Sequence, residues 1–175
     1  MKTLHDKDIR EPLFEFLEEV YGKVRILEEK TMGKSRADVV MVTPDLLCGI
    51  EIKSDADTYA RLKRQVKDYD LYYDCNYAVV GTSHAMHIKE HLPAWWGIIT
   101  VELVEEKADF YIMRKALPNP KTDWKRKIDI LWRPELAHIQ ELNGLPGYKE
   151  KSKLFVQEKV LDKVPREVLQ RQLCE

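Results

Sequence analysis

Two acids and a lysine occur in a pattern that can do chemistry. Asp38 precedes the triplet Glu51-Ile52-Lys53 by thirteen residues. Because side chains alternate along a strand, Glu51 and Lys53 are expected on one face and Ile52 on the other. Antiparallel pairing of two neighbouring strands would bring Asp38 within about 5–8 Å of Glu51. The sequence therefore predicts a patch of two carboxylates and one ammonium group on a sheet.

This patch has the composition of a hydrolytic metal site. Two carboxylates suit a hard divalent cation such as Mg²⁺ or Mn²⁺, which prefers oxygen ligands and keeps several waters. A charged Lys53 is no metal ligand, but it can orient a water or stabilise negative charge on a phosphate. The alternative is that Glu-Ile-Lys is an ordinary half-exposed strand, since such strands alternate charged and apolar residues.

The apolar pattern predicts the elements that would position the patch. The order of helices and strands favours an α/β fold in which a mixed central sheet is flanked by helices. The patch falls on a predicted β-hairpin and is followed directly by a helix. The expected helices cover residues 8–21, 59–73 and 83–92, and the expected strands cover 23–30, 37–42, 47–53, 77–81, 96–102 and, more weakly, 109–113.

The chain changes character after residue 118. Residues 124–142 are expected to form one helix, interrupted at Pro134, and residues 149–173 one or two small charged helices. We therefore predict a core over residues 1–118 and a C-terminal helical extension over 119–175. Trp124, Ile128, Leu131 and Trp132 have the spacing of core residues, although Trp124 and Trp132 also flank the basic run 125–127.

Three short motifs support a specific resemblance. SRAD at residues 35–38, followed by EIK at 51–53, resembles the PD-(D/E)XK nuclease motif, with Ala37 where that family has a proline. QVKDY at 65–69 resembles the Q-x-x-x-Y motif of RecB-type nucleases. The longer runs RADVV, GIEIKSDADT, RLKRQ and PAWWGII resemble the bacterial and phage sce7726 family, so that the likeness covers about residues 8–135.

The resemblance implies a restriction-endonuclease-like fold and magnesium-dependent cleavage of DNA. On this basis Asp38, Glu51 and the carbonyl of Ile52 are expected to hold Mg²⁺ (or Mn²⁺). Lys53 is expected to position the attacking water or to stabilise the transition state, assisted by Gln65.

Basic residues on the following helix are candidates for DNA contacts. Arg61, Arg64 and Lys67 form a local positive patch next to the predicted site, and Arg36 is expected on the strand face of Asp38. Tyr69 lies on the helix face of Arg61 and could contact a phosphate or brace Lys53. The alternatives are a solvated helix face for the cations and a core position for Tyr69.

Nucleases of this type usually recruit another carboxylate, and the sequence does not choose among the candidates. Glu18 and Glu19 lie at the edges of the apolar stripe of the first helix, and Glu29 lies on the first strand. Glu11 is one turn nearer the start of that helix, and Glu15 is opposite its apolar stripe.

Two other polar groups have simpler explanations. Asp55 and Asp57 precede a helix, where aspartates ordinarily cap the first turn. His84, His87 and His91 share helical spacing, but no second ligand cluster accompanies them, so we expect exposed histidines rather than a zinc site.

Composition limits the partners and the compartment. With 29 Lys and Arg against 30 Asp and Glu, the net charge is -1, so DNA binding requires locally concentrated positive charge. No apolar run is long enough to span a membrane and the N-terminus has no signal-peptide pattern, which predicts a cytoplasmic protein. We expect a metal-dependent DNA endonuclease or exonuclease; the alternative is a catalytically silent nuclease-fold module that binds DNA or a protein partner. The sequence leaves homo-oligomers open.

Overall fold

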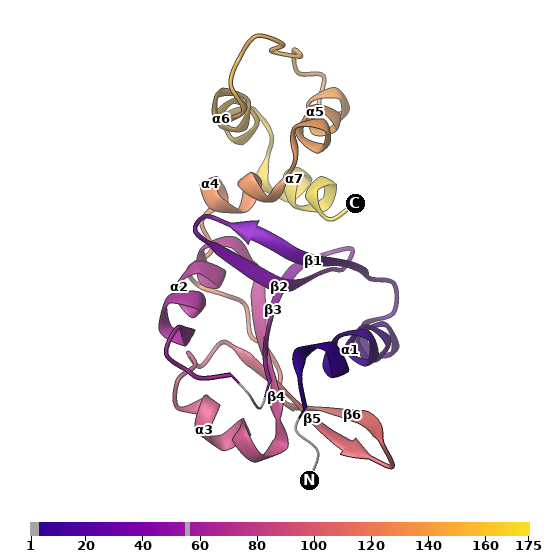
Figure 1. The fold of residues 1–175 in the computed structure, drawn as a ribbon. Helices are drawn as coiled ribbons and strands as arrows, with labels where there is room; N and C mark the ends of the chain where they lie inside the picture. The colour runs from indigo at the N-terminus through magenta and orange to yellow at the C-terminus, as the bar shows by residue number, and fades with distance from the viewer. Residues whose placement is uncertain (1–3, 55–56) are drawn as a thin grey trace.

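A single six-stranded sheet organises the protein (Figure 1). The computed structural model describes residues 4–54 and 57–175. The strands follow the chain in the order β1-β2-β3-β4-β5-β6; β3 and β4 as well as β4 and β5 are parallel, and the other neighbours are antiparallel. The strands are β1 (Arg25–Met32), β2 (Ser35–Val42), β3 (Leu47–Lys53), β4 (Cys75–Gly81), β5 (Gly97–Val104) and β6 (Lys107–Arg114).

Helices cover both faces of this sheet. Ile9, Leu13 and Leu17 form a stripe with four-residue spacing, which packs α1 onto one face. The other face is covered by α2 and α3, and four more helices follow β6. The helices are α1 (Asp6–Tyr21), α2 (Leu62–Tyr72), α3 (Ala85–Lys89), α4 (Trp124–Lys127), α5 (Arg133–Leu142), α6 (Lys153–Lys163) and α7 (Arg166–Leu173), with 3₁₀ turns at Thr82–His84 and Ile128–Ile130. The predicted α/β class, with a mixed sheet, flanking helices and C-terminal helices, is confirmed.

The strand that carries the EIK triplet lies inside the sheet. Ile50 and Ile52 pack beneath α1, whereas Glu51 and Lys53 face α2, and their exposed fractions are only 3% and 5%. The half-exposed-strand alternative is therefore wrong, because helices cover both faces of β3. Burying two charged groups is unfavourable unless they find partners, so the surroundings of this pair are informative.

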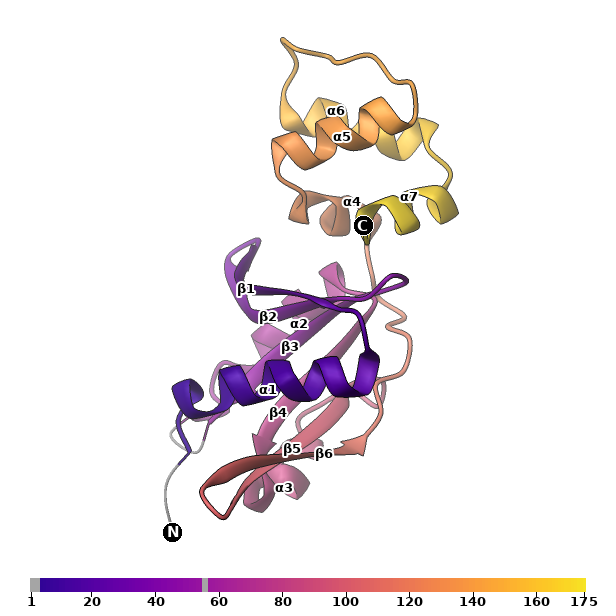
Figure 2. The ribbon, with the colours of Figure 1, turned by 90° about the vertical axis from the view of Figure 1, so that its right-hand side faces the viewer.

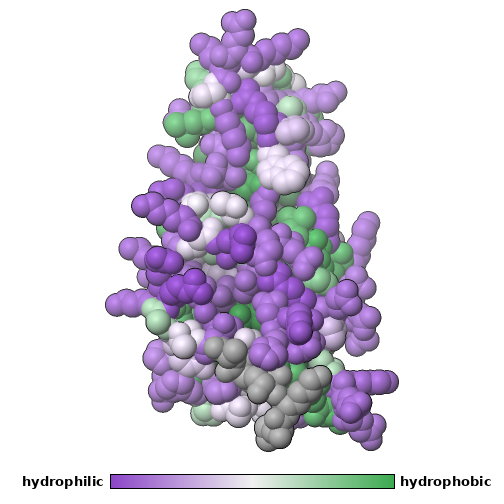
Figure 3. Space-filling view, in the orientation of Figure 1, coloured by the Kyte–Doolittle hydropathy of each residue, from purple (hydrophilic) through white to green (hydrophobic). Residues whose placement is uncertain are grey.

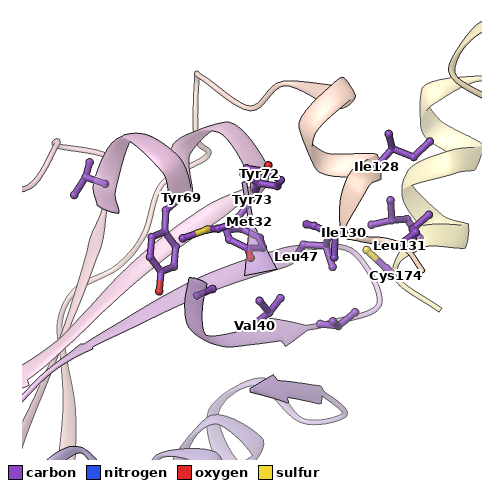
Figure 4. Close-up of a cluster of buried hydrophobic side chains, with 14 of the residues drawn as sticks. Met32, Val40, Leu47, Tyr69, Tyr72, Tyr73, Ile128, Ile130, Leu131 and Cys174 are labelled. Atoms are coloured by element: carbon purple, nitrogen blue, oxygen red, sulfur yellow. The ribbon is translucent and has the colours of Figure 1, made fainter. Parts of the chain in front are cut away.

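The C-terminal helices sit on the end of the sheet near the β1–β2 hairpin (Figures 1 and 2). Ile128, Ile130 and Leu131 join the cluster that also contains Leu47 (Figure 4). Trp132, in contrast, is 69% exposed, which corrects the expectation that it is a core residue. The division at residue 118 stays a prediction.

A buried lysine also connects these helices to the sheet core. Lys127 is 2% exposed, forms an ion pair with Asp74 and donates a hydrogen bond to Gln170 of α7. Asp74 in turn accepts from the backbone N of Leu47 at 2.8 Å. Polar contacts thus fix α4 and α7 to the beginning of β3.

None of the helices within residues 4–54 and 57–175 combines the length and the apolar character that crossing a bilayer requires.

Candidate functional site

The β2–β3 pairing brings the two predicted acids together. Val39 of β2 is paired with Ile50 of β3 at the end of this antiparallel ladder. Asp38 precedes Val39, and Glu51 follows Ile50, so these two residues come next on their strands. One carboxylate oxygen of Asp38, Oδ2, accepts a hydrogen bond from the backbone N of Ile52 at 2.8 Å. The carboxyl groups of Asp38 and Glu51 interact directly. The residues predicted to share a patch therefore do so.

These groups line a polar groove with a volume of about 520 Å³. Its walls come from the start of α1, the tip of the β1–β2 hairpin, the end of β3 and the start of α2. Glu51 and Lys53 are its buried charged residues and Asp38 is half-buried, whereas its arginines are exposed at the rim. The charged residues that line it are Asp6, Glu29, Asp38, Glu51 and Asp57, together with Lys34, Arg36, Lys53, Arg61 and Arg64. Figure 3 shows mostly hydrophilic residues on the face that carries the hairpin tip.

Gln65 joins the lysine to the acid across the groove. Its Oε1 accepts a hydrogen bond from Lys53 Nζ at 2.8 Å, and its Nε2 donates to Glu51 Oε1 at 3.0 Å. Lys53 Nζ also lies 3.5 Å from Glu51 Oε1. The expected partnership of Gln65 with Lys53 is therefore present, and it fixes the direction in which the ammonium group points.

Tyr69 braces the acids from the interior. It is fully buried; its hydroxyl donates to Glu51 Oε2 at 2.5 Å and accepts from the backbone N of Asp38 at 3.1 Å. A side chain in this position cannot reach a bound phosphate. The expectation that Tyr69 contacts DNA is corrected here, and the core alternative is right.

Arg10 of α1 is the site residue that sequence reasoning missed. Its guanidinium lies 3.6 Å from Asp38 Oδ1 and 2.5 Å from Glu29 Oε1, and it donates to the carbonyl of Asp38 at 3.2 Å. It also pairs with Asp6 one turn earlier, the largest of the contacts that raise its pKa. The i, i+4 spacing of Asp6 and Arg10 was the available signal, although it points only to a local helix pair.

The candidates for an additional carboxylate differ in whether they line the groove. Glu18 and Glu19 are exposed and lie about 18 Å along α1 from Asp6, so neither belongs to the groove. The expectation that Glu18 or Glu19 supplies the additional carboxylate is therefore wrong. Glu29 does line the groove, and Asp6, which the sequence analysis did not consider, is the acid that α1 contributes.

Glu29 also has an unusual backbone. Its φ of 53° lies in the left-handed region, although it is neither glycine nor part of a turn. Strain of this kind persists where the surroundings hold it and is concentrated at functional sites. With this backbone, the Glu29 carboxylate forms salt bridges to Arg10 and Arg36, at 2.5 and 2.8 Å.

The electrostatics of the centre favour an added cation. Burial, followed by the nearby Asp38, raises the pKa of Glu51 to about 8, and burial likewise raises the pKa of Asp38. Two acids in contact are difficult to ionise together unless positive charge is supplied.

Two carboxylates and one backbone carbonyl make up the donor set at this place, too few for a metal that needs a full protein cage. Within the described residues, no three His, Cys, Asp or Glu side chains are grouped so that they could hold a metal ion, and this includes the histidines around α3. Asp38, Glu51 and the carbonyl of Ile52 would be the protein ligands, and Mg²⁺ accepts waters in its remaining positions.

The predicted DNA-contacting cations are divided between the groove and the outer surface. Arg61 and Arg64 line the groove, as does Arg36, which is exposed and paired with Glu29. Lys67 is exposed but does not line the groove, so its expected role there is not supported.

The sequence predicted that the two aspartates before α2 cap this helix, and the structure tests this for Asp57 only. Asp57 accepts hydrogen bonds from the backbone N and the hydroxyl of Ser54. It does not cap α2, whose N-cap residue is Arg61, so the expectation of a helix cap is wrong. Asp55 lies outside the described residues.

Fold and site together define a mixed α/β protein with an acidic, lysine-containing centre and a basic rim. The chain belongs to the Bacteriophage P4 protein cII family, whose model matches residues 1–175. No curated protein matches it. Among solved structures, the SPO1766 protein of unknown function from Silicibacter pomeroyi is similar, with 22% identity, 89% of this chain and 99% of that chain covered, and a TM-score of 0.54. This likeness concerns the fold alone.

Proposed function

We propose that this protein is a magnesium-dependent nuclease with a restriction-endonuclease-like fold, which hydrolyses phosphodiester bonds in DNA. The observation that carries the proposal is the convergence of Asp38, Glu51 and Lys53 on a groove with arginines at its rim. The resemblance of the SRAD and EIK segments to the PD-(D/E)XK motif supports the same chemistry.

Asp38, Glu51 and the Ile52 carbonyl would hold the ion. A bound Mg²⁺ supplies a Lewis acid and lowers the pKa of a coordinated water. Burial and the hydrogen bond from Tyr69 fix the position of Glu51, and the hydrogen bond from the backbone N of Ile52 fixes that of the half-buried Asp38. Little reorganisation would therefore be required on binding.

The remaining side chains handle the phosphate. Lys53, directed by its 2.8 Å hydrogen bond to Gln65, stabilises the negative charge that develops on the phosphate or positions the attacking water. Arg61 and Arg64 lie on the same wall, and neither has an ion pair with a described carboxylate. They are therefore available to hold the non-reacting oxygens of a bound strand.

Replacing Asp38 by asparagine tests the proposal. We expect the variant to lose Mg²⁺- or Mn²⁺-dependent cleavage of plasmid and oligonucleotide DNA by at least about 100-fold, because a neutral amide is a poor ligand for a hard cation. Asp109→Asn, an exposed aspartate of β6, is the matched control and should cleave like the wild type. Equal cleavage by both variants would show that the activity comes from another site.

One observation favours a second candidate, a catalytically silent module that binds DNA or a protein partner. Arg10 already contacts Asp38 and Glu29, so it supplies positive charge where a metal would. Calorimetry separates the candidates: the nuclease binds Mn²⁺ in an Asp38-dependent manner, whereas the silent module binds its partner without the ion.

A further inference from the structure

An exposed tryptophan stands on the C-terminal extension beside the first strand. Trp132 is 69% exposed, whereas Trp96 is buried and Trp95 and Trp124 are partly buried. The ammonium group of Lys30 in β1 lies 4.9 Å from the centre of the Trp132 ring. Tryptophan is enriched at binding surfaces, and here a cation stands beside its exposed ring.

This tryptophan stands beside the strand that forms one wall of the groove. Lys30 is flanked in β1 by Glu29 and Thr31, both of which line the groove. The tip of the β1–β2 hairpin, the first turn of α1 and the beginning of α5 all lie along the left side of Figure 2. Trp132 immediately precedes α5 and contacts Lys30 of β1, so a ligand that leaves the groove across β1 would reach its ring.

The charge of the extension suits an anionic ligand. Residues 119–175 contain 12 Lys and Arg against 9 Asp and Glu, whereas residues 1–118 contain 17 against 21. The positive charge that the whole chain lacks is therefore concentrated in the extension. Near Trp132, Lys30 interacts electrostatically with Glu135 and with Lys153. The guanidinium of Arg133 is directed away from this pair, to the backbone carbonyls of Tyr148 and Lys151.

Two acids also lie near this surface. Asp129 takes part in an ion pair with Lys153 at 3.6 Å, and Glu135 accepts a hydrogen bond from the backbone N of Trp132 at 2.8 Å. The Glu135 carboxylate is therefore directed to the start of α5, and the ring itself remains available.

We propose that Trp132, with Lys30 and Lys153, binds single-stranded nucleic acid that continues from the groove. An indole face stacks on an unpaired base, whereas a duplex presents only base edges in its grooves. The inference rests on the proposed function for the path of the strand, but binding at Trp132 needs neither the metal nor cleavage.

Fluorescence anisotropy with the full chain in EDTA tests this surface. The probe is a labelled oligothymidylate of about 16 nucleotides, long enough to reach beyond the groove. Trp132→Ala should raise its Kd by about 5- to 100-fold, the effect of losing one stacked base, whereas Trp132→Phe keeps an aromatic face and most of the affinity. Tyr111→Ala removes an equally exposed aromatic (69%) from β6, at the other edge of the sheet, and should leave the Kd unchanged.

Specific outcomes would overturn the inference. Equal Kd values for Trp132→Ala and the wild type would do so, as would equal effects of Trp132→Ala and Tyr111→Ala, or equal affinity for the matching duplex. Loss of cleavage with retained Trp132-dependent binding would overturn only the nuclease proposal. Asp38-dependent cleavage without an effect of Trp132 on binding would overturn only this surface.

Discussion

Replacing Lys53 by methionine is expected to lower metal-dependent DNA cleavage by about 10²- to 10³-fold, the effect of removing one pre-set charge-stabilising group. Methionine keeps an unbranched apolar side chain in the buried channel of β3 and removes only the ammonium group. Because Lys53 is no metal ligand, Mn²⁺ affinity measured by calorimetry should remain within a few-fold of the wild type. Retained metal binding with lost cleavage would identify Lys53 as part of the reaction chemistry.

The matched control is Lys63→Met, an exposed lysine of α2 that does not line the groove. It should cleave at the wild-type rate. The Lys53 variant leaves Gln65 Oε1 without its donor, which costs about 1–3 kcal/mol, so thermal unfolding must confirm that it is folded under the assay conditions. A folded Lys53→Met protein that cleaves normally contradicts the assigned role.

The unfolding free energy of the metal-free protein is expected to fall as pH rises from about 4.5 to 8. The pKa of Glu51 is about 8 in the folded state against an ordinary value of 4.5, so within this window the folded state retains a proton that the unfolded state releases. Raising the pH therefore favours unfolding, by on the order of 3–5 kcal/mol over the whole window. Burial raises the pKa of Asp38 too, which acts in the same direction.

Urea unfolding in EDTA between pH 5 and 8 measures this dependence. Glu51→Gln removes the titrating group, so the difference in slope between the wild type and this variant isolates Glu51 from the histidines. Saturating Mn²⁺ should flatten the wild-type slope, because the cation stabilises the ionised acids. Two results would contradict the raised pKa of Glu51. One is a wild-type unfolding free energy that rises from pH 5 to 8, and the other is an unchanged slope in Glu51→Gln.

The sequence was informative about the site because its signals are local. Strand alternation and the turn between β2 and β3 predicted the hairpin, and the pairing of Val39 with Ile50 brings Asp38 and Glu51 together. Local patterns could not show that β3 lies inside the sheet. Its burial depends on α1 and α2, which are distant in sequence, and an alternating strand reads the same whether one face or both are covered.

Contacts between distant segments account for the residues that were misassigned. Arg10 meets Asp38 only when α1 packs across the sheet, twenty-eight residues away in the chain. Tyr69 lies one turn after Gln65 on the same face of α2. Only the packing of α2 on β3 shows that Tyr69 is buried in the core, whereas Gln65 reaches the groove. Trp132 had core spacing on the predicted helix over residues 124–142, but the chain is extended at Leu131 and Trp132, which turns the ring outward.

The central claim is that Asp38 and Glu51 share a divalent cation. Crystals grown with Mn²⁺, with diffraction data collected near the manganese absorption edge, test it most directly. We predict an anomalous peak between the two carboxylates, within coordination distance of the Ile52 carbonyl and absent in Asp38→Asn. An empty position between the two acids, at a Mn²⁺ concentration that supports cleavage, would contradict the account.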